Sequence, residues 1–357
     1  MIVRWSRVLV VTPSYEGTDG VSTVTRAYVA ALASGGADAG LPRVDVWSLG
    51  DNHRPALLPE HVGFRAALGS RVRFATYAVR ERRVDSSMLV IVQHVHLLPT
   101  ALALQARGAR VMLLMHGIEV WKRLRALERL ACRRAWKLAA VSAYTVRRFH
   151  RANPDLANRL VEICAPGLPA RESTGLSRDA APYALIVGRM NAAERYKGHD
   201  ELIDVWPAVH AAVPGARLVI AGGGDDAARL EQKAAGLGLG EAVRFEGVVG
   251  DARLATLYQG AAVFAMPSAN EGFGLVYVEA LRAGVPCIVA AGAAEEIVEH
   301  ERTGIVIKAG DRDALARAVI RLLRNREDRT RMSAAARAAS SRFTAEAFAT
   351  RLEALLC

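Results

Sequence analysis

The sequence has few cysteines and no long apolar segment. Of its 357 residues, four are cysteines, which are widely separated and form neither a CxxC pair nor a metal-binding spacing with histidine: Cys132, Cys164, Cys287 and Cys357. The N-terminal region has only a short apolar run at 8–11, too short for a signal peptide or for a membrane span of about 20 residues. These absences predict a reduced, cytoplasmic chain that contacts a membrane only peripherally.

Several motifs of other protein classes are also missing. The chain has no Walker loop, no GxGxxG fingerprint and no DxD-like pair of aspartates. It also lacks an aromatic-interleaved RNA motif, a helix-turn-helix signature and zinc spacing. We therefore predict no metal ion, no separate cofactor and no nucleic acid as a partner. A basic polyanion-binding protein stays open as an alternative from another class, because the sequence pI is 9.9.

Acidic residues are scarce in the first half only. Residues 1–170 carry 24 Lys and Arg against 12 Asp and Glu, whereas residues 171–357 carry 23 against 24, so the first half holds the whole excess behind the net charge of +11. Such an uneven charge predicts that the first half meets a membrane surface, a phosphorylated substrate or another anion.

The excess falls into two clusters, one at 65–83 and one at 122–137. At about 100° per residue, the second cluster would cover one face of a helix over 121–137 and leave the apolar residues on the other. A solvated helix face is the alternative. The charge of the whole half favours an anionic surface or a lipid-phosphate acceptor. The basic residues are Arg65, Arg71, Arg73, Arg80, Arg82, Arg83, Lys122, Arg123, Arg125, Arg129, Arg133, Arg134 and Lys137; the apolar ones are Leu124, Leu127, Ala131, Ala135 and Leu138.

Short β-branched runs alternate with Ala- and Leu-rich segments of helical period, which is typical of parallel sheets with crossover helices. The sequence thus predicts an α/β fold with two doubly wound, Rossmann-like domains facing across a cleft. The expected parts are an acceptor-binding domain at 1–168, a linker at 169–182, a donor-binding domain at 183–340, and a helix at 341–357 that crosses back to the first domain. The predicted strands are 7–11, 43–47, 88–92, 110–115, 138–141, 183–188, 217–221, 243–246, 262–266, 286–290 and 304–307.

Two groups of charged residues in the second half stand near glycines. Arg189 follows Gly188 at the end of a predicted strand, and Lys197 precedes the next helix; two cations at a strand end suit a diphosphate. Glu271 lies in a loop, and Glu279 lies eight positions later in the following helix. A glycine-containing turn that opens a helix can hold an anion or sugar hydroxyls. Taken alone, either group can equally be solvated surface charge.

Together, these residues resemble the retaining glycosyltransferases of family GT4, which have the GT-B fold. The matching segments occur in the family's order, and the last ones cover the end of its donor domain. They are Gly188-Arg189-Met190, Lys197-Gly198-His199, the AGGG turn from Ala221, Phe245-Glu246-Gly247-Val248, the Glu271…Glu279 pair, the segment from Gly284 to Ala290, Ala294 to Val298, and Thr303-Gly304.

The resemblance implies a retaining, metal-independent transfer of a hexose-type sugar from a nucleotide diphosphate. Arg189 and Lys197 would neutralise the diphosphate, and Glu279 would accept from the ribose hydroxyls. Glu271 would hydrogen bond to the transferred sugar, together with the amides of Gly272, Phe273, Gly274 and Leu275. Ser268 and Asn270 are weaker candidates, and for Glu295 we favour a charge at a helix N-terminus over a donor contact.

The first half matches the family at three places. The family commonly has a Gly-Gly pair where this chain has Asp19-Gly20, and Gly20 is assigned to the donor diphosphate; a turn with an N-cap explains it too. His116 corresponds to the family's histidine facing the donor sugar, and Ser142 to a strand-end serine that is either an N-cap or a ligand contact. His94 and His96 alternate across a strand end, so at most one is expected to face the cleft.

We accordingly expect a glycosyltransferase whose acceptor is a lipid-linked or cell-surface glycan intermediate. It would work in the cytoplasm, in peripheral contact with an anionic membrane through the N-terminal domain. A soluble small-molecule acceptor is the alternative. A relative that has lost catalysis is disfavoured by the four charged residues, and a sugar phosphorylase of similar fold would use phosphate in place of a nucleotide. The residues do not identify the donor base, the sugar, the linkage or the oligomeric state.

Overall fold

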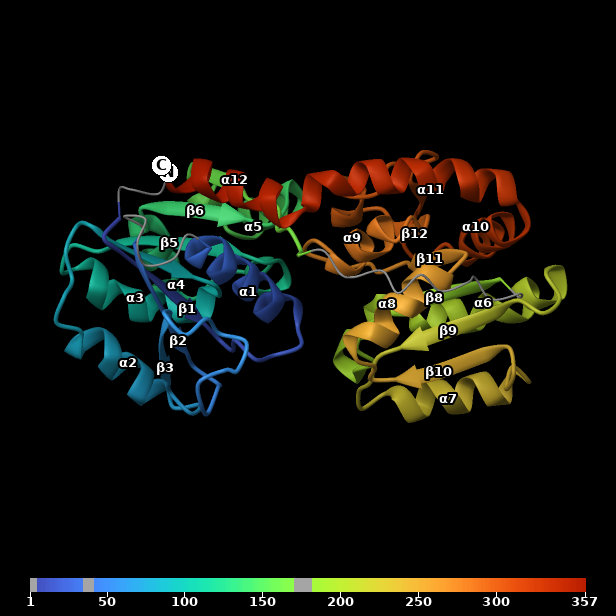
Figure 1. The fold of residues 1–357 in the computed structure, drawn as a ribbon, viewed down its shortest axis with the longest axis horizontal. Helices are drawn as coiled ribbons and strands as arrows, with labels where there is room; N and C mark the ends of the chain where they lie inside the picture. The colour runs from blue at the N-terminus through green and yellow to red at the C-terminus, as the bar shows by residue number, and fades with distance from the viewer. Residues whose placement is uncertain (1–4, 35–41, 170–181) are drawn as a thin grey trace. The chain divides into compact units, whose positions relative to one another are not determined.

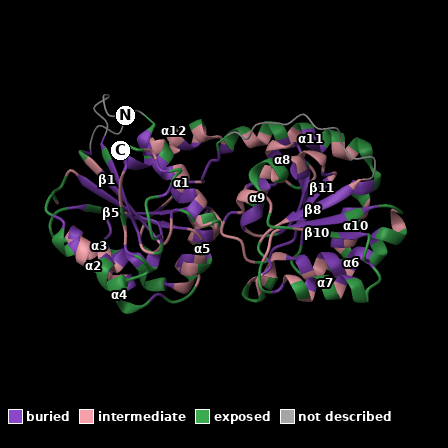
Figure 2. Cartoon of the chain, turned by 60° about the horizontal axis from the view of Figure 1, so that its bottom comes forward, coloured by how far each residue is buried: buried purple, intermediate pink, exposed green. Residues whose placement is uncertain are grey.

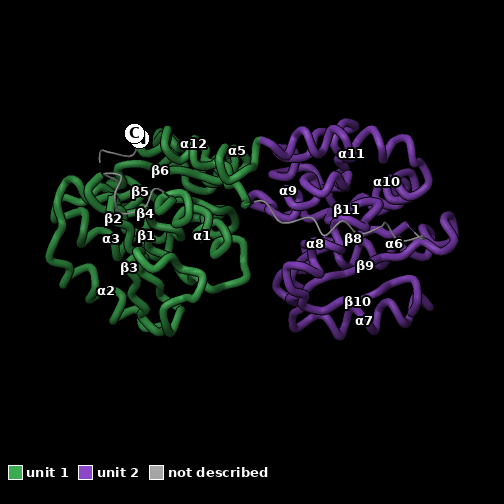
Figure 3. The backbone as a smooth tube through the Cα atoms, in the orientation of Figure 1, with its two compact units in different colours: residues 1–169, 342–357 green, residues 170–341 purple. Residues whose placement is uncertain are grey.

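The computed structural model describes residues 5–34, 42–169 and 182–357. The chain divides into two compact units, which Figure 3 distinguishes by colour. Unit 1 comprises residues 1–169 and 342–357, and unit 2 comprises residues 170–341. The linker expected at 169–182 lies almost wholly outside the described residues, which resume at residue 182.

Unit 1 is built on one parallel sheet with the strand order β3-β2-β1-β4-β5-β6-β7. Its central strands β1, β4 and β5 are buried except at the first residue of β1 and of β5 (Figure 2), as expected for a sheet covered by helices on both faces. The elements, many of which are labelled in Figure 1, are β1 (Arg7–Thr12), α1 (Gly20–Ala33), β2 (Arg43–Ser48), β3 (Gly63–Ala66), α2 (Arg71–Arg80), β4 (Met88–Val92), η1 (Val95–Leu97), α3 (Leu98–Gln105), β5 (Arg110–Met115), η2 (Ile118–Val120), α4 (Ala126–Arg134), β6 (Lys137–Ala140), α5 (Ala143–Ala152), η3 (Pro154–Leu156), β7 (Val161–Ile163) and α12 (Ala345–Leu356).

Unit 2 repeats this plan with the order β10-β9-β8-β11-β12-β13, again parallel throughout. The α/β class and the doubly wound sheets expected from the sequence are thereby confirmed. The elements are β8 (Tyr183–Val187), η4 (Ala192–Lys197), α6 (His199–Ala212), β9 (Arg217–Ala221), α7 (Ala227–Gly236), β10 (Val243–Gly247), α8 (Asp251–Gly260), β11 (Val263–Met266), α9 (Leu275–Arg282), β12 (Cys287–Ala290), η5 (Ala293–Glu296), β13 (Gly304–Ile307), α10 (Arg312–Arg324), α11 (Arg326–Ser340) and η6 (Ser341–Phe343).

The last helix, α12, packs in unit 1 although it ends the chain. The Phe348 ring lies 5.0 Å from the Tyr28 ring of α1. The Trp5 indole donates to the carbonyl of Leu356 at 3.1 Å, and Arg351 Nε donates to the carbonyl of Ala165 at 3.1 Å. Aromatic packing and buried backbone contacts therefore hold the C-terminal helix against the first unit.

The helix expected over 121–137 is much shorter than predicted. Asn153 Oδ1 accepts from the amide of Leu124, and α4 starts only at Ala126. Glu128 in its first turn accepts from the amide of Arg125, and the helix stops at Arg134 because Ala135 turns to an extended conformation. The residues assigned to the packed face are buried except for one: Leu127, in the first turn of α4, is 53% exposed.

Two strands, β3 and β7, were not expected. β3 reads GFRA and β7 reads VEI, so neither has the apolar run that identified the others. Both lie at the edges of the first sheet. An edge strand pairs with only one neighbour and is less buried, so it does not need a continuous apolar run. No helix of the described residues is both long and apolar enough to cross a bilayer.

Each sheet reverses its order of strand addition at one point. In unit 1 this point lies between β1 and β4, and in unit 2 it lies between β8 and β11. Loops that leave the carboxyl ends of these two strands run to opposite faces of the sheet, which opens a crevice where α/β proteins bind ligands. The candidate residues are therefore described from these two points.

Candidate functional site

Lys197 and Glu271 meet at the reversal point of unit 2. Lys197 lies on the segment that follows β8, and Glu271 lies on the segment that follows β11. Lys197 Nζ is 3.5 Å from Glu271 Oε1, and the two side chains are 15% and 17% exposed. Ser268 Oγ donates to the same carboxylate oxygen at 3.1 Å. Three polar groups from two strand ends thus converge on one largely buried spot.

The backbone brings these two segments together. The amide of Ala269 donates to the carbonyl of Tyr196 at 3.0 Å, one residue before Lys197. Gly198, the next residue, has a φ of +96°, and a Cβ there would lie 2.6 Å from Pro267 Cδ. Only glycine allows both this conformation and this approach. The position of Lys197 therefore depends on the absence of a side chain at Gly198.

Arg189 lies closer to solvent than Lys197. Its Nη2 forms an ion pair with Glu194 Oε1 at 2.5 Å, and its side chain is 49% exposed. Glu194 belongs to η4, the short helix between β8 and α6. The two cations predicted for a diphosphate thus occur in different settings: Lys197 is enclosed, whereas Arg189 is held at the surface by a neighbour in sequence.

The glycine turn after β9 supports the segment that carries Arg189. Its backbone approaches so closely that a Cβ at Gly222 would lie 2.0 Å from the carbonyl oxygen of Gly188. The amide of Met190 donates to the carbonyl of Gly223 at 2.8 Å. The AGGG turn, which resembles a segment of the family's donor domain, therefore packs through its backbone against the segment from Gly188 to Met190 and supports it.

Two aspartates after this turn were missed by the sequence reasoning. Asp225 accepts from the amide of Ala192 at 2.8 Å. Asp226 is bonded by Arg195 at 2.8 Å and by Arg229 at 2.6 Å, and these guanidinium groups hold the pKa of its carboxyl well below the usual range. Both aspartates tie the η4 segment to α7. Two adjacent aspartates directly after a run of glycines could have indicated, from the sequence, side chains that hold a neighbouring loop in place.

The glycine-rich segment after Glu271 leads into α9. Gly274, with a φ of +98°, precedes its first residue, Leu275, and Phe273 beside it is buried. Glu279 lies in the second turn, where its Oε2 accepts from the Tyr258 hydroxyl at 2.9 Å. The start of α9 thus presents amides from Gly272 onward in the same segment as the Glu271 carboxylate.

His199, the first residue of α6, is buried beside Gly188, where a Cβ would lie 3.6 Å from the imidazole Cε1. It is 3% exposed, and burial together with Lys197 lowers its pKa to about 4. Its Nε2 has no hydrogen-bond partner among the described residues. The imidazole is therefore neutral at pH 7, and protonating it would place an unpaired charge beside Lys197.

In unit 1, His116 lies at the carboxyl end of β5. Its Nε2 is 3.3 Å from Gln93 Oε1, at the end of the neighbouring β4, and its amide donates to Glu119 Oε1 at 2.6 Å. Burial, assisted by His94, lowers the pKa of His116 to about 3, and burial raises the pKa of Glu119. At neutral pH the ring is uncharged, so it can serve as a hydrogen-bonding group without adding charge.

The pair His94 and His96 does not alternate across a strand, contrary to the expectation. β4 ends at Val92; His94 is the N-cap of η1 and His96 lies within it, with their rings 4.8 Å apart. His96 Nδ1 lies 2.7 Å from Glu128 Oε1, whereas burial and the neighbouring His96 lower the pKa of His94 to about 4. The strand ends two residues earlier than an alternation requires, so the argument from period 2 is wrong here.

The loop between β1 and α1 is held from both sides. The buried Asp51, which follows β2, accepts from Ser14 Oγ and from the amide of Tyr15, both at 2.6 Å. Arg26 of α1 donates to the carbonyls of Tyr15 and Gly17 at 2.6 and 2.9 Å. Ser14, Asp51 and Arg26 were not identified from the sequence, because residues so far apart in the chain carry no local motif.

Gly20 begins α1, and three capping residues account for other sequence matches. Asp19 accepts from the amide of Ser22 at 3.0 Å and so caps α1; a Cβ at Gly20 would have no neighbour within 4 Å. Ser142 caps α5 through the amide of Thr145 at 3.1 Å. Glu295 accepts from the amide of Gly292 at 2.8 Å, which confirms the favoured interpretation as a helix N-terminal charge.

Several residues of the basic cluster at 122–137 form ion pairs within unit 1. Asp155 alone receives Arg123 at 3.1 Å, Arg129 at 3.3 Å and Arg133 at 2.7 Å. Lys137 lies in β6 and contacts Glu162 at 3.2 Å. Five of the seven basic residues are exposed, as expected, but three of the arginines share the Asp155 carboxylate. Within the described ranges, no three His, Cys, Asp or Glu side chains group as metal ligands would.

Comparison with known proteins places these residues in context. Residues 174–339 match the family described as "Glycosyl transferases group 1". A GDP-mannose-dependent alpha-(1-6)-phosphatidylinositol monomannoside mannosyltransferase of Mycobacterium tuberculosis is 33% identical over 65% of this chain, and the match spans 65% of that protein, just under two thirds of its length. A GDP-mannose-dependent monoacylated alpha-(1-6)-phosphatidylinositol monomannoside mannosyltransferase of Corynebacterium glutamicum is 30% identical over 73% of this chain and 72% of that protein.

Solved structures share the fold at low sequence identity. A sucrose-phosphate synthase from Thermosynechococcus elongatus superposes with a TM-score of 0.80 at 21% identity, covering 98% of both chains. The Anabaena protein Alr3699/HepE, crystallised with UDP, superposes with a TM-score of 0.78 at 21% identity, covering 97% of this chain and 98% of that one. At this identity the likeness concerns the fold.

Proposed function

Because the chain belongs to the group 1 glycosyltransferases, we propose that it transfers a hexose-type sugar from a nucleotide diphosphate to an acceptor. Unit 2 makes most of the contacts to the donor in this proposal, and unit 1 binds the acceptor. The observation that carries it is the enclosed contact between Lys197 and Glu271 at 3.5 Å, at the reversal point of the second sheet.

Lys197 and Arg189 act on the diphosphate. When the bond between the sugar and the diphosphate breaks, negative charge develops on the leaving group, and these two cations stabilise it in place of a metal ion. Lys197 has the larger role because it is more enclosed than Arg189. In a site with little water, its attraction to the diphosphate is less screened.

The sugar and the nucleoside are held by hydrogen bonds. Glu271 accepts from sugar hydroxyls, while the amides from Gly272 to Leu275 bind the sugar and its phosphate. Glu279 accepts from the ribose hydroxyls, and the Tyr258 hydroxyl that donates to it at 2.9 Å keeps the carboxylate in place. In unit 1, the neutral His116 contributes a hydrogen bond to the transferred sugar, and Gly20 leaves room for the diphosphate at the start of α1.

The transfer retains the anomeric configuration. The acceptor hydroxyl attacks from the face that the diphosphate leaves, and a diphosphate oxygen takes the hydroxyl proton as the new glycosidic bond forms. Glu271 forms no covalent intermediate in this account, since its carboxylate is engaged by Lys197 and Ser268.

The acceptor we propose is a lipid-linked glycan intermediate. The two mannosyltransferases compared above are named for phosphatidylinositol mannoside acceptors, and the excess of cations lies in the first half. The chain would then work at the cytoplasmic face of the membrane in peripheral contact. A soluble small-molecule acceptor is the second candidate, supported by a relative named D-inositol 3-phosphate glycosyltransferase, 32% identical over 55% of this chain.

The test is a screen of UDP-, GDP- and ADP-sugars. One donor is expected to raise the midpoint of thermal unfolding by mass action and to be hydrolysed slowly without an acceptor. Turnover is expected to persist in EDTA, and NMR of the product formed with a lipid-linked acceptor is expected to show the donor's anomeric configuration. Binding and hydrolysis of none of the donors contradicts the proposed activity. An inverted linkage, or loss of turnover in EDTA, contradicts the mechanism alone.

A further inference from the structure

Helix α2 has an exposed apolar stripe on its outer face. Val72 is 77% exposed and Val79 is 69% exposed, with Ala75 exposed between them. At about 100° per residue these three residues fall within an arc of about 60°. Phe74 and Ala78 on the opposite face are each 1% exposed and belong to the core of unit 1. The helix is thus apolar both toward the core and toward solvent.

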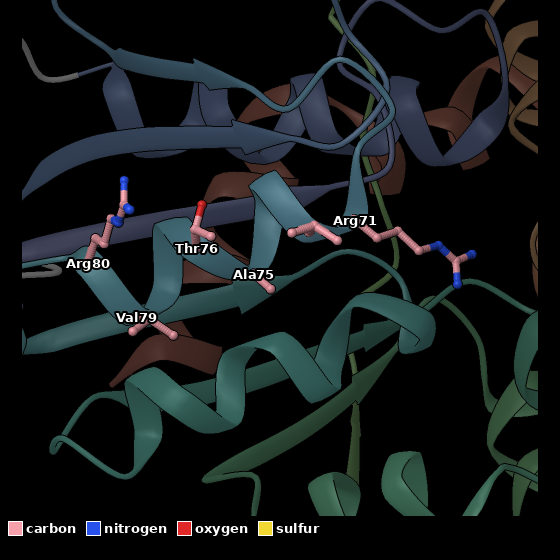
Figure 4. Close-up of a pocket in the computed structure, with 6 residues that line it drawn as sticks. Arg71, Ala75, Thr76, Val79 and Arg80 are labelled. Carbon is pink, nitrogen blue, oxygen red and sulfur yellow. The ribbon is translucent and has the colours of Figure 1, made fainter.

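Arginines border this stripe. Arg73 and Arg80 lie along one side of it, Arg71 lies on the other, and Arg82 and Arg83 follow the end of the helix. Figure 4 shows Thr76 and Arg80 along one edge and Ala75 and Val79 along the other, with Arg71 extending from the first turn. These six lining residues, Val72 included, form a shallow depression made by one helix alone.

The five arginines of α2 and its C-terminal extension are exposed, and none forms an ion pair in the part of the chain that is described. The nearest buried carboxylate, Glu81, is already paired with Arg7 and with Arg65, both at 3.1 Å. Asp85 is the exposed acid nearest in sequence, and Ser87 engages it. The positive charge of this surface therefore remains available to a partner.

The combination suits an anionic lipid surface. Small apolar side chains on one arc of a helix can enter the boundary between headgroups and acyl chains. Arginine stems lie along apolar surface while the guanidinium groups reach outward, and a guanidinium group binds phosphate oxygens in a bidentate way. A protein partner with an acidic rim would match the charge, but a bilayer also accounts for an exposed apolar stripe that lies on a single helix.

We propose that α2 binds this protein to anionic membranes: Val72, Ala75 and Val79 enter the interface, and the five arginines contact lipid phosphates. The inference deepens the proposed lipid-linked acceptor, since it names the surface that brings the chain to the lipid. It also relocates the contact expected at 122–137, where four of the seven cations are ion-paired with Asp155 or Glu162.

Binding of this kind is weak and salt-dependent. Two valines bury too little apolar area to hold the chain on a neutral bilayer, so the arginines have to supply most of the attraction. Each arginine near an anionic surface strengthens binding about fivefold. Salt screens this attraction over about 10 Å at 0.1 M ionic strength. The full chain is thus expected to bind vesicles that contain anionic lipid and to leave them at high salt.

The experiment is co-sedimentation of the full chain with vesicles of phosphatidylcholine and with vesicles of equal parts phosphatidylcholine and phosphatidylglycerol. The wild type is expected to bind only the second kind. The double variant R73Q/R80Q is expected to bind about 25-fold more weakly, and V72S/V79S several-fold more weakly. The matched control R317Q/R326Q removes two exposed arginines from α10 and α11 and is expected to bind as the wild type does.

Equal losses in the control and the α2 variant would overturn the proposal in favour of a diffuse charge effect. So would equal binding to both kinds of vesicle, binding of DNA in place of vesicles, or a dimer that V72S/V79S dissociates with no change in sedimentation. No sugar donor is needed in this assay. A chain that binds the vesicles but transfers no sugar contradicts the proposed activity only, and a chain that transfers sugar but ignores them contradicts the role of α2 only.

Discussion

Units 1 and 2 place different chemistry on the same strand order. In unit 2, the loops at the reversal point carry charged side chains that pair with each other, as in the 3.5 Å contact between Lys197 and Glu271. In unit 1, the corresponding place holds Gln93 and two histidines whose pKa values are well below the usual range, so these three side chains are uncharged at pH 7. The cations of unit 1 lie instead on outer surfaces such as α2.

This difference separates location from role. The order of parallel strands decides where loops converge, and it does so identically in both units. The residues on those loops decide what can bind there: paired charges suit a diphosphate, and neutral hydrogen-bonding groups suit a sugar. The assignment of a diphosphate to unit 2 and of sugar hydrogen bonding to unit 1 is testable. Each unit has a residue whose removal is expected to affect only one of these two interactions.

The largest effect is expected from Lys197→Ala. Removal of the enclosed cation should lower kcat about 100- to 1,000-fold, because charge on the leaving diphosphate loses its main stabiliser. Initial rates of donor turnover measure this. The control Lys308→Ala removes an exposed lysine after β13 in the same unit and should leave the rate unchanged. Near wild-type turnover in Lys197→Ala with an unaltered unfolding midpoint would refute the diphosphate role.

His116→Asn tests the neutral centre of unit 1. We expect the rate of transfer to fall about 10- to 100-fold through loss of one hydrogen bond in the transition state. The wild type should show no loss of activity from this group between pH 8 and 5, because its pKa of about 3 keeps the ring neutral there. His150→Asn, on α5, is the matched control. A charged role would appear as an acid limb near pH 6.5 that the variant abolishes.

Glu279→Gln separates donor binding from chemistry. The carboxylate is proposed to contact the ribose and not the reacting bond, so KM for the donor should rise about 10-fold while kcat stays within a factor of two. Steady-state kinetics at varied donor concentration resolve the two parameters. Glu327→Gln, an exposed position on α11, serves as the control. A fall in kcat at unchanged KM would move Glu279 into the reacting centre.

The smallest effect concerns stability and His199. Its pKa in the folded chain is about 4, below the ordinary value of 6.5. Below pH 6.5 the unfolded chain therefore takes up a proton that the folded chain does not, so the free energy of unfolding falls by up to about 1.4 kcal/mol per pH unit until about pH 4. Urea unfolding at pH 7, 6 and 5 measures the slope. His199→Phe should flatten it, and an identical slope in both proteins would show that His199 does not contribute.

Much of the fold was predictable from local pattern. β4, β5, β9 and β13 have the predicted boundaries, because each is an apolar run bounded by turn residues. β3 and β7 lack such runs, and they are strands only because the neighbouring strand offers hydrogen bonds. The helix over 121–137 failed for the converse reason. Its periodicity extends past both ends, but Asn153 and the start of β6 stop the helix earlier.

The candidate site divides in the same way. Glycines and charges near strand ends identified Arg189, Lys197 and Glu271, since a motif of a few residues records them. The groups that position them, such as Asp226 and the close approach of Gly222 to Gly188, were missed because each involves partners some 30 residues apart. The charge of the cluster at 122–137 can likewise be counted in the sequence. The ion pairs that its arginines form with Asp155 cannot be predicted from it.

By itself, the sequence determined the alternation of strands and helices, the uneven charge and the residues that we propose to bind a nucleotide sugar, because these depend on residue type and short-range spacing. Only the tertiary structure decided that Lys197 and Glu271, 74 positions apart, form one contact. It also decided that the arginines of α2 form no ion pair with any described residue, while Asp155 pairs with three of the arginines near α4. Both outcomes depend on which distant segments the sheet order brings together, and no local pattern records that.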